Sequence, residues 1–255
     1  MIKFFRKIRY NLMEQNKTGK YLKYAIGEIV LVMIGILLAL QVNNWNNQRL
    51  DAKKEQLILK NLKSDFETNL DELDSIYQST YDAYLASRDL LEAIKSDSPL
   101  EHSEVDLLLG DIINKTSSLD LISGSVDEIT STGSISIIRD QDLRKLISNW
   151  SYYESDTEDD IIIMVDYLMN FFIPAISDKA NFRNIPVPVH FEDDFELPEI
   201  SKSGFSIDYD KTLKTLEFEN VVFNNALNYM YTLNQYKRLE TYLRDTVELI
   251  EANIK

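Results

Sequence analysis

The sequence predicts an all-α protein: one N-terminal transmembrane helix that continues into a long stalk helix, followed by an antiparallel helical bundle. Three observations support this fold class. Residues 24–42 form an apolar stretch, and no glycine or proline occurs in the 63 positions between Gly35 and Pro99. Apolar residues recur every three or four positions near both ends of the remaining chain, which is the period of a helix with one buried face.

The apolar stretch at residues 24–42 has the length of a membrane span. It holds 19 residues and a single charge, Glu28. As a helix it would extend about 28 Å, close to the hydrocarbon thickness of a bilayer. Because no second apolar run of this length follows, we expect a single crossing.

Charge before the span predicts its orientation. Residues 1–23 carry seven basic residues against Glu14, a net charge of 7 − 1 = +6. Short segments rich in Lys and Arg stay in the cytoplasm. We therefore expect a cytoplasmic tail at residues 1–23, a bacterial inner-membrane helix at 24–42 and a periplasmic domain at 43–255.

A cleaved signal peptide is the alternative, since a basic region followed by an apolar run fits both. The apolar run is longer than a usual signal-peptide core, and no clear small-x-small cleavage site follows it. These features favour an uncleaved signal-anchor.

The exported part is predicted to open and close with long helices. After the span, a stripe with helical spacing runs from Leu59 to Ile94. A second begins near Asp210, includes Leu216, Phe223 and Met230, and reaches the C-terminus. A lone amphipathic helix cannot bury its stripe, so other segments or another protomer must cover it. Two long helices with shorter ones between them describe an antiparallel bundle.

Shorter helices are predicted between these two. The apolar spacing and the flanking Gly, Pro and capping residues indicate helices at 104–115, at 126–132 as a helix or turn, at 141–153 behind an Asp140 N-cap, and at 161–173. Ile161–Ile173 is almost wholly apolar and is followed by Pro174, which we expect to end it. It is too short to span a bilayer, so a buried core helix is favoured over membrane re-entry. Residues 181–206 are predicted to form a surface loop.

The composition argues against nucleic acid as a partner and excludes disulfide bonds. After residue 23 the chain holds 20 basic and 41 acidic residues, a net charge of −21, which argues against nucleic acid as a partner. The chain has no cysteine, so its core must hold the fold without disulfides.

No residue constellation indicates catalysis, a metal site or a cofactor. The two histidines, His102 and His190, have no partners at metal-ligand spacing, and no glycine-rich phosphate loop occurs. Acidic clusters at 154–160 and 192–196 have the oxygen ligands that Ca²⁺ uses, but not the EF-hand spacing. Solvated helix ends or loops are the favoured interpretation, and we expect a protein that is not an enzyme.

Two sets of residues are candidates for contact. Tyr77, Tyr81 and Tyr84 share one helical stripe and either line a ligand cleft between helices or pack against a neighbouring helix, with packing favoured. In the span, Gly35 and Ala39 form a small-xxx-small pair that permits close helix approach. A candidate membrane-helix contact face combines them with the residues at the same spacing: Glu28, Val32, Gly35, Ala39 and Asn43. A lipid-facing helix is its alternative.

Two blocks of the chain resemble a known family. The first comprises MIKFFRKIR and KYAIGEIVLVMIGILLALQVNNWN within residues 1–47, and the second is STGSISIIRDQDLR at residues 131–144, with Thr132 where Ser is more usual. They are similar to an uncharacterised family of bacterial single-span membrane proteins. The resemblance implies an inner-membrane anchor with a periplasmic helical domain and brings no assigned activity.

These observations predict a membrane-anchored scaffold or accessory subunit that acts through protein contacts, either with an envelope protein or with further copies of itself. A ligand-sensing helical input domain is the alternative. Because the 23-residue cytoplasmic tail has no room for an output domain, such a sensor would have to signal through a partner protein.

Overall fold

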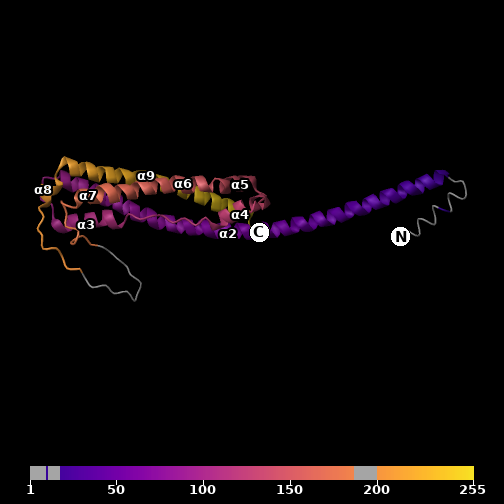
Figure 1. Ribbon diagram of the computed structural model, residues 1–255, viewed down its shortest axis with the longest axis horizontal. Coiled ribbons are helices and arrows are strands. Elements are labelled where there is room, and N and C mark those ends of the chain that lie inside the picture. Colours follow the sequence, from indigo (N-terminus) through magenta and orange to yellow (C-terminus); the bar gives the residue numbers. More distant parts are fainter. Residues whose placement is uncertain (1–9, 11–17, 187–199) are drawn as a thin grey trace. The chain divides into compact units, whose positions relative to one another are not determined.

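The computed structural model describes residue 10, residues 18–186 and residues 200–255, and every regular element in these ranges is a helix (Figure 1). The prediction of an all-α fold is therefore confirmed. The chain divides into two compact units, residues 1–57 and residues 58–255.

The first unit contains the apolar stretch. Helix α2, Thr18–Lys95, begins in this unit and contributes its later residues to the second. From Ile26 to Val42 the large apolar side chains are exposed, for example Ile29 at 66% and Leu38 at 61%. Within the described residues, α2 is the one helix long and apolar enough to cross a membrane.

The second unit is a helical bundle. After α2 the elements are α3 (His102–Asn114), α4 (Gly124–Ser131), the 3₁₀ helix η1 (Ser134–Ile137), α5 (Gln141–Ser148), α6 (Trp150–Tyr167), the π-helix η2 (Leu168–Phe172), α7 (Ile173–Ile176), α8 (Tyr209–Leu213) and α9 (Leu216–Asn253). Helices α2 and α9 are antiparallel. Lys63 pairs with Glu251 at 2.7 Å, while farther along α2 the ring of Tyr77 lies 4.3 Å below the Nζ of Lys237.

Two hydrophobic clusters form the core of this unit. One centres on aromatic rings, with Phe66 and Trp150 5.1 Å apart and Tyr242 stacked on Tyr153 at 4.0 Å. The other joins α2, α3, η2 and α9 through residues such as Leu90, Leu109, Phe172 and Phe218. The predicted stripes of the two long helices thus cover each other and the shorter helices, within the same chain.

Several local predictions are confirmed. Helix α3 nearly matches the predicted 104–115 segment and buries Val105, Leu109 and Ile112. The Asp140 carboxylate accepts a hydrogen bond from the Leu143 amide at 2.8 Å, so Asp140 is the N-cap of α5. This bond lowers the pKa of Asp140.

The α5–α7 region differs from the prediction in two respects. Helix α6 runs straight through the acidic segment 154–160, because α9 pairs with it: Gln235 and Arg238 contact the Asp156 carboxylate at 2.7 and 3.3 Å. The segment 161–173 is also only half buried, since Ile162 and Ile163 are more than half exposed.

The prediction that Pro174 ends the helix is wrong. The chain widens into η2, where the Ile173 amide donates to the Leu168 carbonyl five residues back, and then continues as α7 with Pro174 in its first turn. A π-turn relaxes the ladder of i→i−4 bonds, and proline at the start of the next helical segment needs no amide hydrogen.

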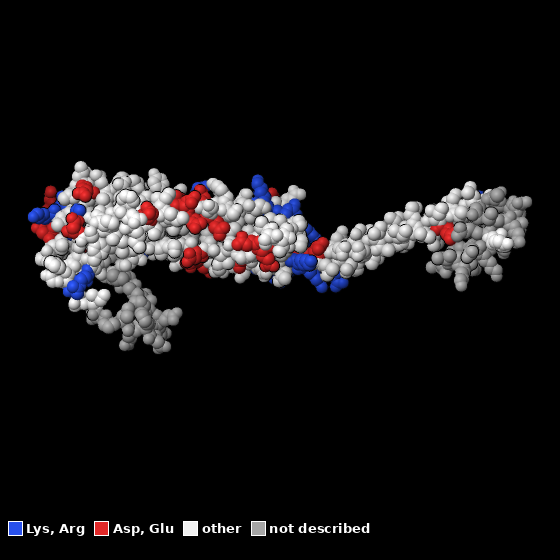
Figure 2. Space-filling view, in the orientation of Figure 1, with Lys and Arg blue, Asp and Glu red and all other residues white. Residues whose placement is uncertain are grey.

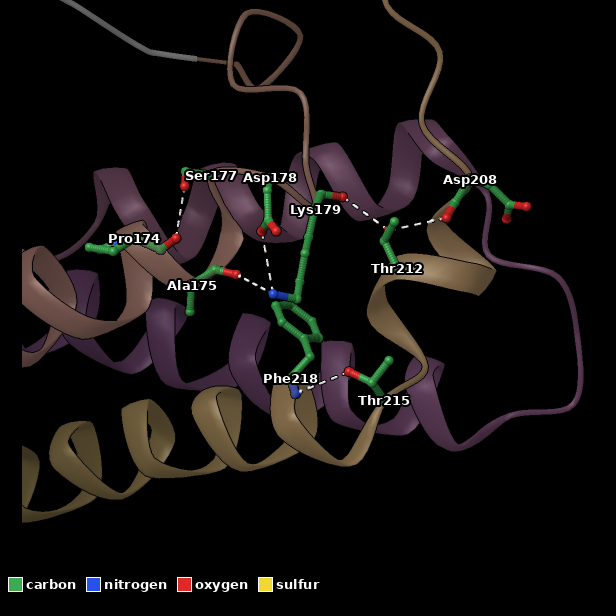
Figure 3. A network of polar contacts seen from close by, with 9 residues as sticks. All are labelled: Pro174, Ala175, Ser177, Asp178, Lys179, Asp208, Thr212, Thr215 and Phe218. Atoms are coloured by element: carbon green, nitrogen blue, oxygen red, sulfur yellow. Dashed lines mark hydrogen bonds and ion pairs between the residues drawn. The ribbon is translucent and has the colours of Figure 1, made fainter.

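The C-terminal helix is also interrupted near its start. Asp208 caps the short α8 through the Lys211 amide, the helix breaks at residues 214–215, and Thr215 caps α9 by accepting from the Phe218 amide at 3.2 Å (Figure 3). In the same network, Thr212 donates to the Lys179 carbonyl at 3.1 Å and so ties α8 to the end of α7 (Figure 3).

The predicted loop at 181–206 is described only at its two ends. These ends are linked: the Arg183 guanidinium donates to the Ser201 carbonyl at 2.6 Å, and the Asn181 amide donates to the Phe205 carbonyl at 3.2 Å. His190 and the acidic cluster at 192–196 lie outside the described residues.

Candidate interaction surfaces

The five residues of the predicted membrane-helix contact face all lie in α2. Their spacing of three and four places Glu28, Val32, Gly35, Ala39 and Asn43 on one side of a helix. Apart from the adjoining residues and backbone of α2 itself, no heavy atom of the described residues lies within 4 Å of the position that a Cβ on Gly35 would take, and Val32 is 55% exposed. This side of the helix is therefore open for contact.

The three predicted tyrosines form a ladder along α2. The ring centroids of Tyr77 and Tyr81 are 6.2 Å apart and those of Tyr81 and Tyr84 are 6.3 Å apart, all close to parallel. Tyr81 is 39% exposed. The depression beside Tyr77 and Lys237 has a volume of about 10 Å³, room for about one water molecule. Unlike Tyr81, Tyr77 and Tyr84 are half-buried and pack against the hydrophobic core.

A larger depression of about 240 Å³ lies between the loop after α3 and helix α6. Its walls are apolar at Leu119, Leu121 and Ile161 and acidic at Asp120, Glu154 and Glu158. Burial, together with the charges of Asp127 and Glu158, raises the pKa of Glu154. No group of three metal-ligating side chains with metal-site geometry occurs in the part of the chain that the structure describes.

His102 opens α3, and its ring lies 4.9 Å from that of Tyr209. The Tyr209 hydroxyl contacts the Asp106 carboxylate at 2.5 Å, and burial raises the pKa of Tyr209 well above its usual range. The histidine is thus part of an aromatic contact where α3 meets α8.

Sequence reasoning missed a set of polar residues in the core. Eight such residues are buried in the second unit: Asn69, Thr80, Ser87, Thr157, Asn225, Thr232, Gln235 and Thr246. Some are fully paired, as Asn69 is with both backbone polar groups of Ile122. By contrast, the side chains of Thr80 and Asn225 and the Tyr236 hydroxyl form no hydrogen bond of standard geometry with the described residues. A signal was present, since Thr80 and Ser87 fall on the same helical spacing as Leu73, Ala83 and Leu90.

Large apolar side chains, by contrast, lie on the outside of α9. Residues 220–236 contain no charged residue, and in this segment Phe223, Met230 and Tyr231 are 51%, 49% and 65% exposed. Phe223 and Met230, with Leu216, had been included in the predicted helical stripe, and all three are exposed.

Helix α6 and η2 extend this surface. The Tyr167 hydroxyl donates to the Val221 carbonyl of α9 at 3.3 Å, and the Tyr167 ring stacks on Phe171 at 5.4 Å. Ile163 lies one turn before Tyr167, and both Ile163 and Phe171 are 57% exposed. We call the exposed set Ile163, Phe171, Phe223, Met230 and Tyr231 the neutral face.

Charged side chains are sparse around the neutral face. Residues 161–176 contain one charge, Asp166, whose carboxylate accepts a hydrogen bond from Asn170 at 2.7 Å. Figure 2 shows few charged side chains over the part of the bundle that carries the α9 and α7 labels in Figure 1, and more of them toward both ends of the bundle. An uncharged surface that exposes several large apolar residues is typical of an interaction site.

These features define a class: an all-α protein with one helix long and apolar enough to cross a membrane, and a helical bundle with an exposed neutral face. More particularly, residues 28–161 match DUF6090, a family of unknown function, and the chain belongs to this family. No curated protein and no solved structure matches the chain.

Proposed function

We propose that this protein is a membrane-anchored helical scaffold or accessory subunit that acts through protein–protein contacts and carries out no catalysis. The neutral face is the observation that carries the proposal, because an exposed apolar surface on a helical bundle is costly unless a partner covers it. The apolar helix would supply the anchor.

Topology is part of the proposal: residues 1–23 in the cytoplasm, an uncleaved inner-membrane helix, and the bundle in the periplasm. Because the chain has no cysteine, single cysteines can report on each side. In intact spheroplasts, a membrane-impermeant maleimide should label Lys255→Cys and leave Lys3→Cys unlabelled until the membrane is lysed. Labelling of position 3 from outside, or loss of the N-terminus from the mature chain, would contradict this topology.

The contact role is tested by affinity capture of the full chain in mild detergent, with quantification by mass spectrometry. We expect a reproducible partner or a second copy of the chain, and a loss of it when Tyr231→Glu places a charge in the neutral face. A monomer without any reproducible partner would refute the proposal.

The membrane helix offers a second contact. Gly35→Leu should weaken association in the bilayer, because it adds bulk to the face that Ala39 shares; an interhelical hydrogen bond on this face would contribute about 1 kcal/mol or less. Ile36→Ala, on another side of α2, is the matched control and should have little effect in crosslinking. Equal behaviour of both variants would leave α2 as an anchor only.

A ligand-sensing role is a second candidate, favoured by the depression lined by Asp120, Glu154 and Glu158. Its acidic and apolar walls suit a small organic cation. Thermal-shift screening of the full chain with amines, and with Glu154→Gln as the control, tests this role. If no amine raises the unfolding temperature, the sensing role is refuted.

A further inference from the structure

We infer that the depression between the loop after α3 and helix α6 is a docking site for a basic side chain, lysine or arginine, of a partner protein. It rests on the proposed function, since it names the chemistry by which a partner would contact the scaffold. We call this site the acidic depression; it is lined by residues 119–121 and by Glu154, Thr157, Glu158 and Ile161.

The carboxylates of the acidic depression have no basic side chain paired with them. Elsewhere in the bundle lysines and arginines pair with acidic side chains at 2.7–3.4 Å, for example with Glu240 and Glu251. Among the residues that the structure describes, no ion pair involves Asp120, Glu154 or Glu158. Like charges on one surface repel each other, so a cation bound among them would relieve this repulsion.

Glu154 shows the effect of this missing counter-charge. Its pKa is raised by burial and by the negative charges of Asp127 and Glu158. Asp160 on the same helix differs, because the positive charge of Arg238 offsets part of the rise in its pKa. A bound ammonium or guanidinium group would give Glu154 both a counter-charge and a charge-assisted hydrogen bond.

The walls of the acidic depression suit the remainder of a basic side chain. Leu119 and Ile161 are buried and Leu121 is half-buried, so apolar and acidic side chains line the same space. Lysine and arginine carry an apolar stem of three or four methylene groups that ends in a cation, and they bury the stem along apolar surface. The volume of about 240 Å³ is below the roughly 300–1,000 Å³ of pockets that take drug-sized ligands, and it suits one long side chain.

The loop that forms one side of the acidic depression is anchored to α2. The Asn69 side chain accepts a hydrogen bond from the Ile122 amide at 2.7 Å and donates one to the Ile122 carbonyl at 2.9 Å. The Asp65 carboxylate accepts another from the Ser125 amide at 3.0 Å. These bonds hold the loop in place before any partner arrives, so docking there costs little ordering of the chain.

Exposed apolar side chains beside the acidic depression indicate that the basic group belongs to a protein. Ile122 follows Leu121 in the loop and is 43% exposed, and Ile162 lies one turn after Glu158 and is 56% exposed. The residues next to a docked lysine or arginine in a partner chain can cover both isoleucines, whereas a free amine would leave them in water. Residues 58–255 carry 17 basic and 38 acidic residues, a net charge of 17 − 38 = −21, which attracts a basic partner from a distance.

Site-specific photocrosslinking of the full chain in cells of its natural host tests the inference. We would place the photoreactive residue p-benzoylphenylalanine at position 122 or 162, with position 107 on α3, where Leu107 is 58% exposed, as the control. Positions 122 and 162 should link to the same protein, and position 107 should not. The double variant Glu154→Lys and Glu158→Lys should reduce the linked fraction at least about tenfold, because like charges would meet at the depression.

Two further variants separate the effect of charge from that of folding. Glu154→Gln with Glu158→Gln keeps the shapes of the side chains and should reduce the linked fraction less, by several fold. Asp245→Lys with Glu248→Lys makes the same change in net charge on exposed residues of α9 outside the depression, and it should leave the linked fraction unchanged. Circular dichroism of the purified variants checks that each of them folds.

A charge exchange with the partner gives the sharpest readout. The crosslinked peptide, mapped by mass spectrometry, should contain a lysine or arginine whose replacement by glutamate abolishes linkage to the wild-type chain. The same replacement should restore linkage to the variant with Glu154→Lys and Glu158→Lys, which a purely structural role of these two carboxylates would not produce. Raising NaCl from about 50 to about 500 mM should weaken the contact between the purified proteins by several fold, because salt screens opposite charges.

Three outcomes would overturn the inference. Linkage that persists with Glu154→Lys and Glu158→Lys would show that these carboxylates do not hold the partner. Thermal stabilisation of the full chain by agmatine, an alkylguanidinium, without any protein crosslink would assign the depression to a free amine. Absence of crosslinks at positions 122 and 162, in a chain that still captures a protein through Tyr231, would refute this docking site and leave the proposed function standing. Loss of both crosslinking and capture would refute both.

Discussion

The two faces of α9 between Asn220 and Tyr236 each contain exceptions to the usual rule that apolar residues are buried and polar ones exposed. The inner face buries Asn225, Thr232 and Gln235, while the outer face exposes Phe223, Met230 and Tyr231. Gln235 and Thr232 donate hydrogen bonds to Asp156 and Asp160 of α6, whereas the Asn225 amide has no hydrogen bond of standard geometry with the described residues, and an unpaired buried amide reduces stability. The outer side chains are about half exposed, so they contribute less to folding than buried ones and leave apolar area available for a contact.

The inner face also holds a buried tyrosine, Tyr229, whose hydroxyl is hydrogen-bonded. Tyr229 is fully buried, and its hydroxyl contacts the Ile112 carbonyl at 3.0 Å and the Thr116 hydroxyl at 2.6 Å. It thus joins α9 to α3 by both packing and hydrogen bonds.

The largest expected effect is at this tyrosine. Tyr229→Ala should lower the free energy of unfolding by about 3–5 kcal/mol, because it removes a buried ring and its hydrogen bonds. The adjacent Met230→Ala, on the outer face, should change it by no more than about 0.5 kcal/mol. Chemical denaturation of the full chain in detergent, followed by circular dichroism, measures both. Similar losses at 229 and 230 would show that the outer face is buried in the folded protein.

The second largest expected effect is a loss of protein stability at high pH, caused by the buried tyrosines of the inner face. Burial raises the pKa of Tyr229 to about 12 and that of Tyr236 to about 12, above their ordinary value of about 10. Their contribution is fully present below pH 10, and it is lost as the pH rises toward 12, because the unfolded chain releases these protons first. At pH 11 the loss should be on the order of 1 kcal/mol for each tyrosine.

The measurement is the unfolding free energy at pH 9 and pH 11, compared with the double variant Tyr229→Phe and Tyr236→Phe. The double variant should show a distinctly smaller drop over this interval. An identical drop in both proteins would mean that these two hydroxyls do not carry the effect.

A smaller effect, a gain and not a loss of stability, is expected from replacing the buried polar groups that have no hydrogen bond. Burial raises the pKa of Tyr236, and the nearby Thr80 side chain offsets part of this rise, yet neither group has a hydrogen bond of standard geometry with the described residues. Replacing both with apolar residues of the same shape, Thr80→Val and Tyr236→Phe, should leave stability unchanged or raise it by up to about 1 kcal/mol. Asn69→Leu is the contrasting control, since Asn69 is fully paired with Ile122, and it should destabilise the protein. A clear loss in the double variant would reveal a stabilising contact between the two hydroxyls.

The sequence predicted elements best where one local signal decides the structure. Asp140 is a residue type that favours the N-cap position, and it caps α5. The interval after Gly35 that lacks glycine and proline is helical as far as Lys95, as part of α2. Pro174 was misread because its effect depends on the preceding turn: once η2 has relaxed the backbone ladder, the proline can begin α7. The acidic segment in α6 is helical because Arg238 and Gln235 of a distant helix pair with Asp156.

The sequence by itself determined the helical class of this protein, the apolar stretch long enough to cross a membrane, and the two long amphipathic helices, because periodicity and breakers act through local sterics and burial. Only the tertiary structure decided which side of α9 is inside. Helical spacing alone does not show which apolar residues of a wide stripe are buried, because that depends on where the neighbouring helices pack. Phe223 and Met230 were therefore predicted with the core and lie on the neutral face, whereas Asn225 and Thr80 are buried because α2 and α9 pack into one core.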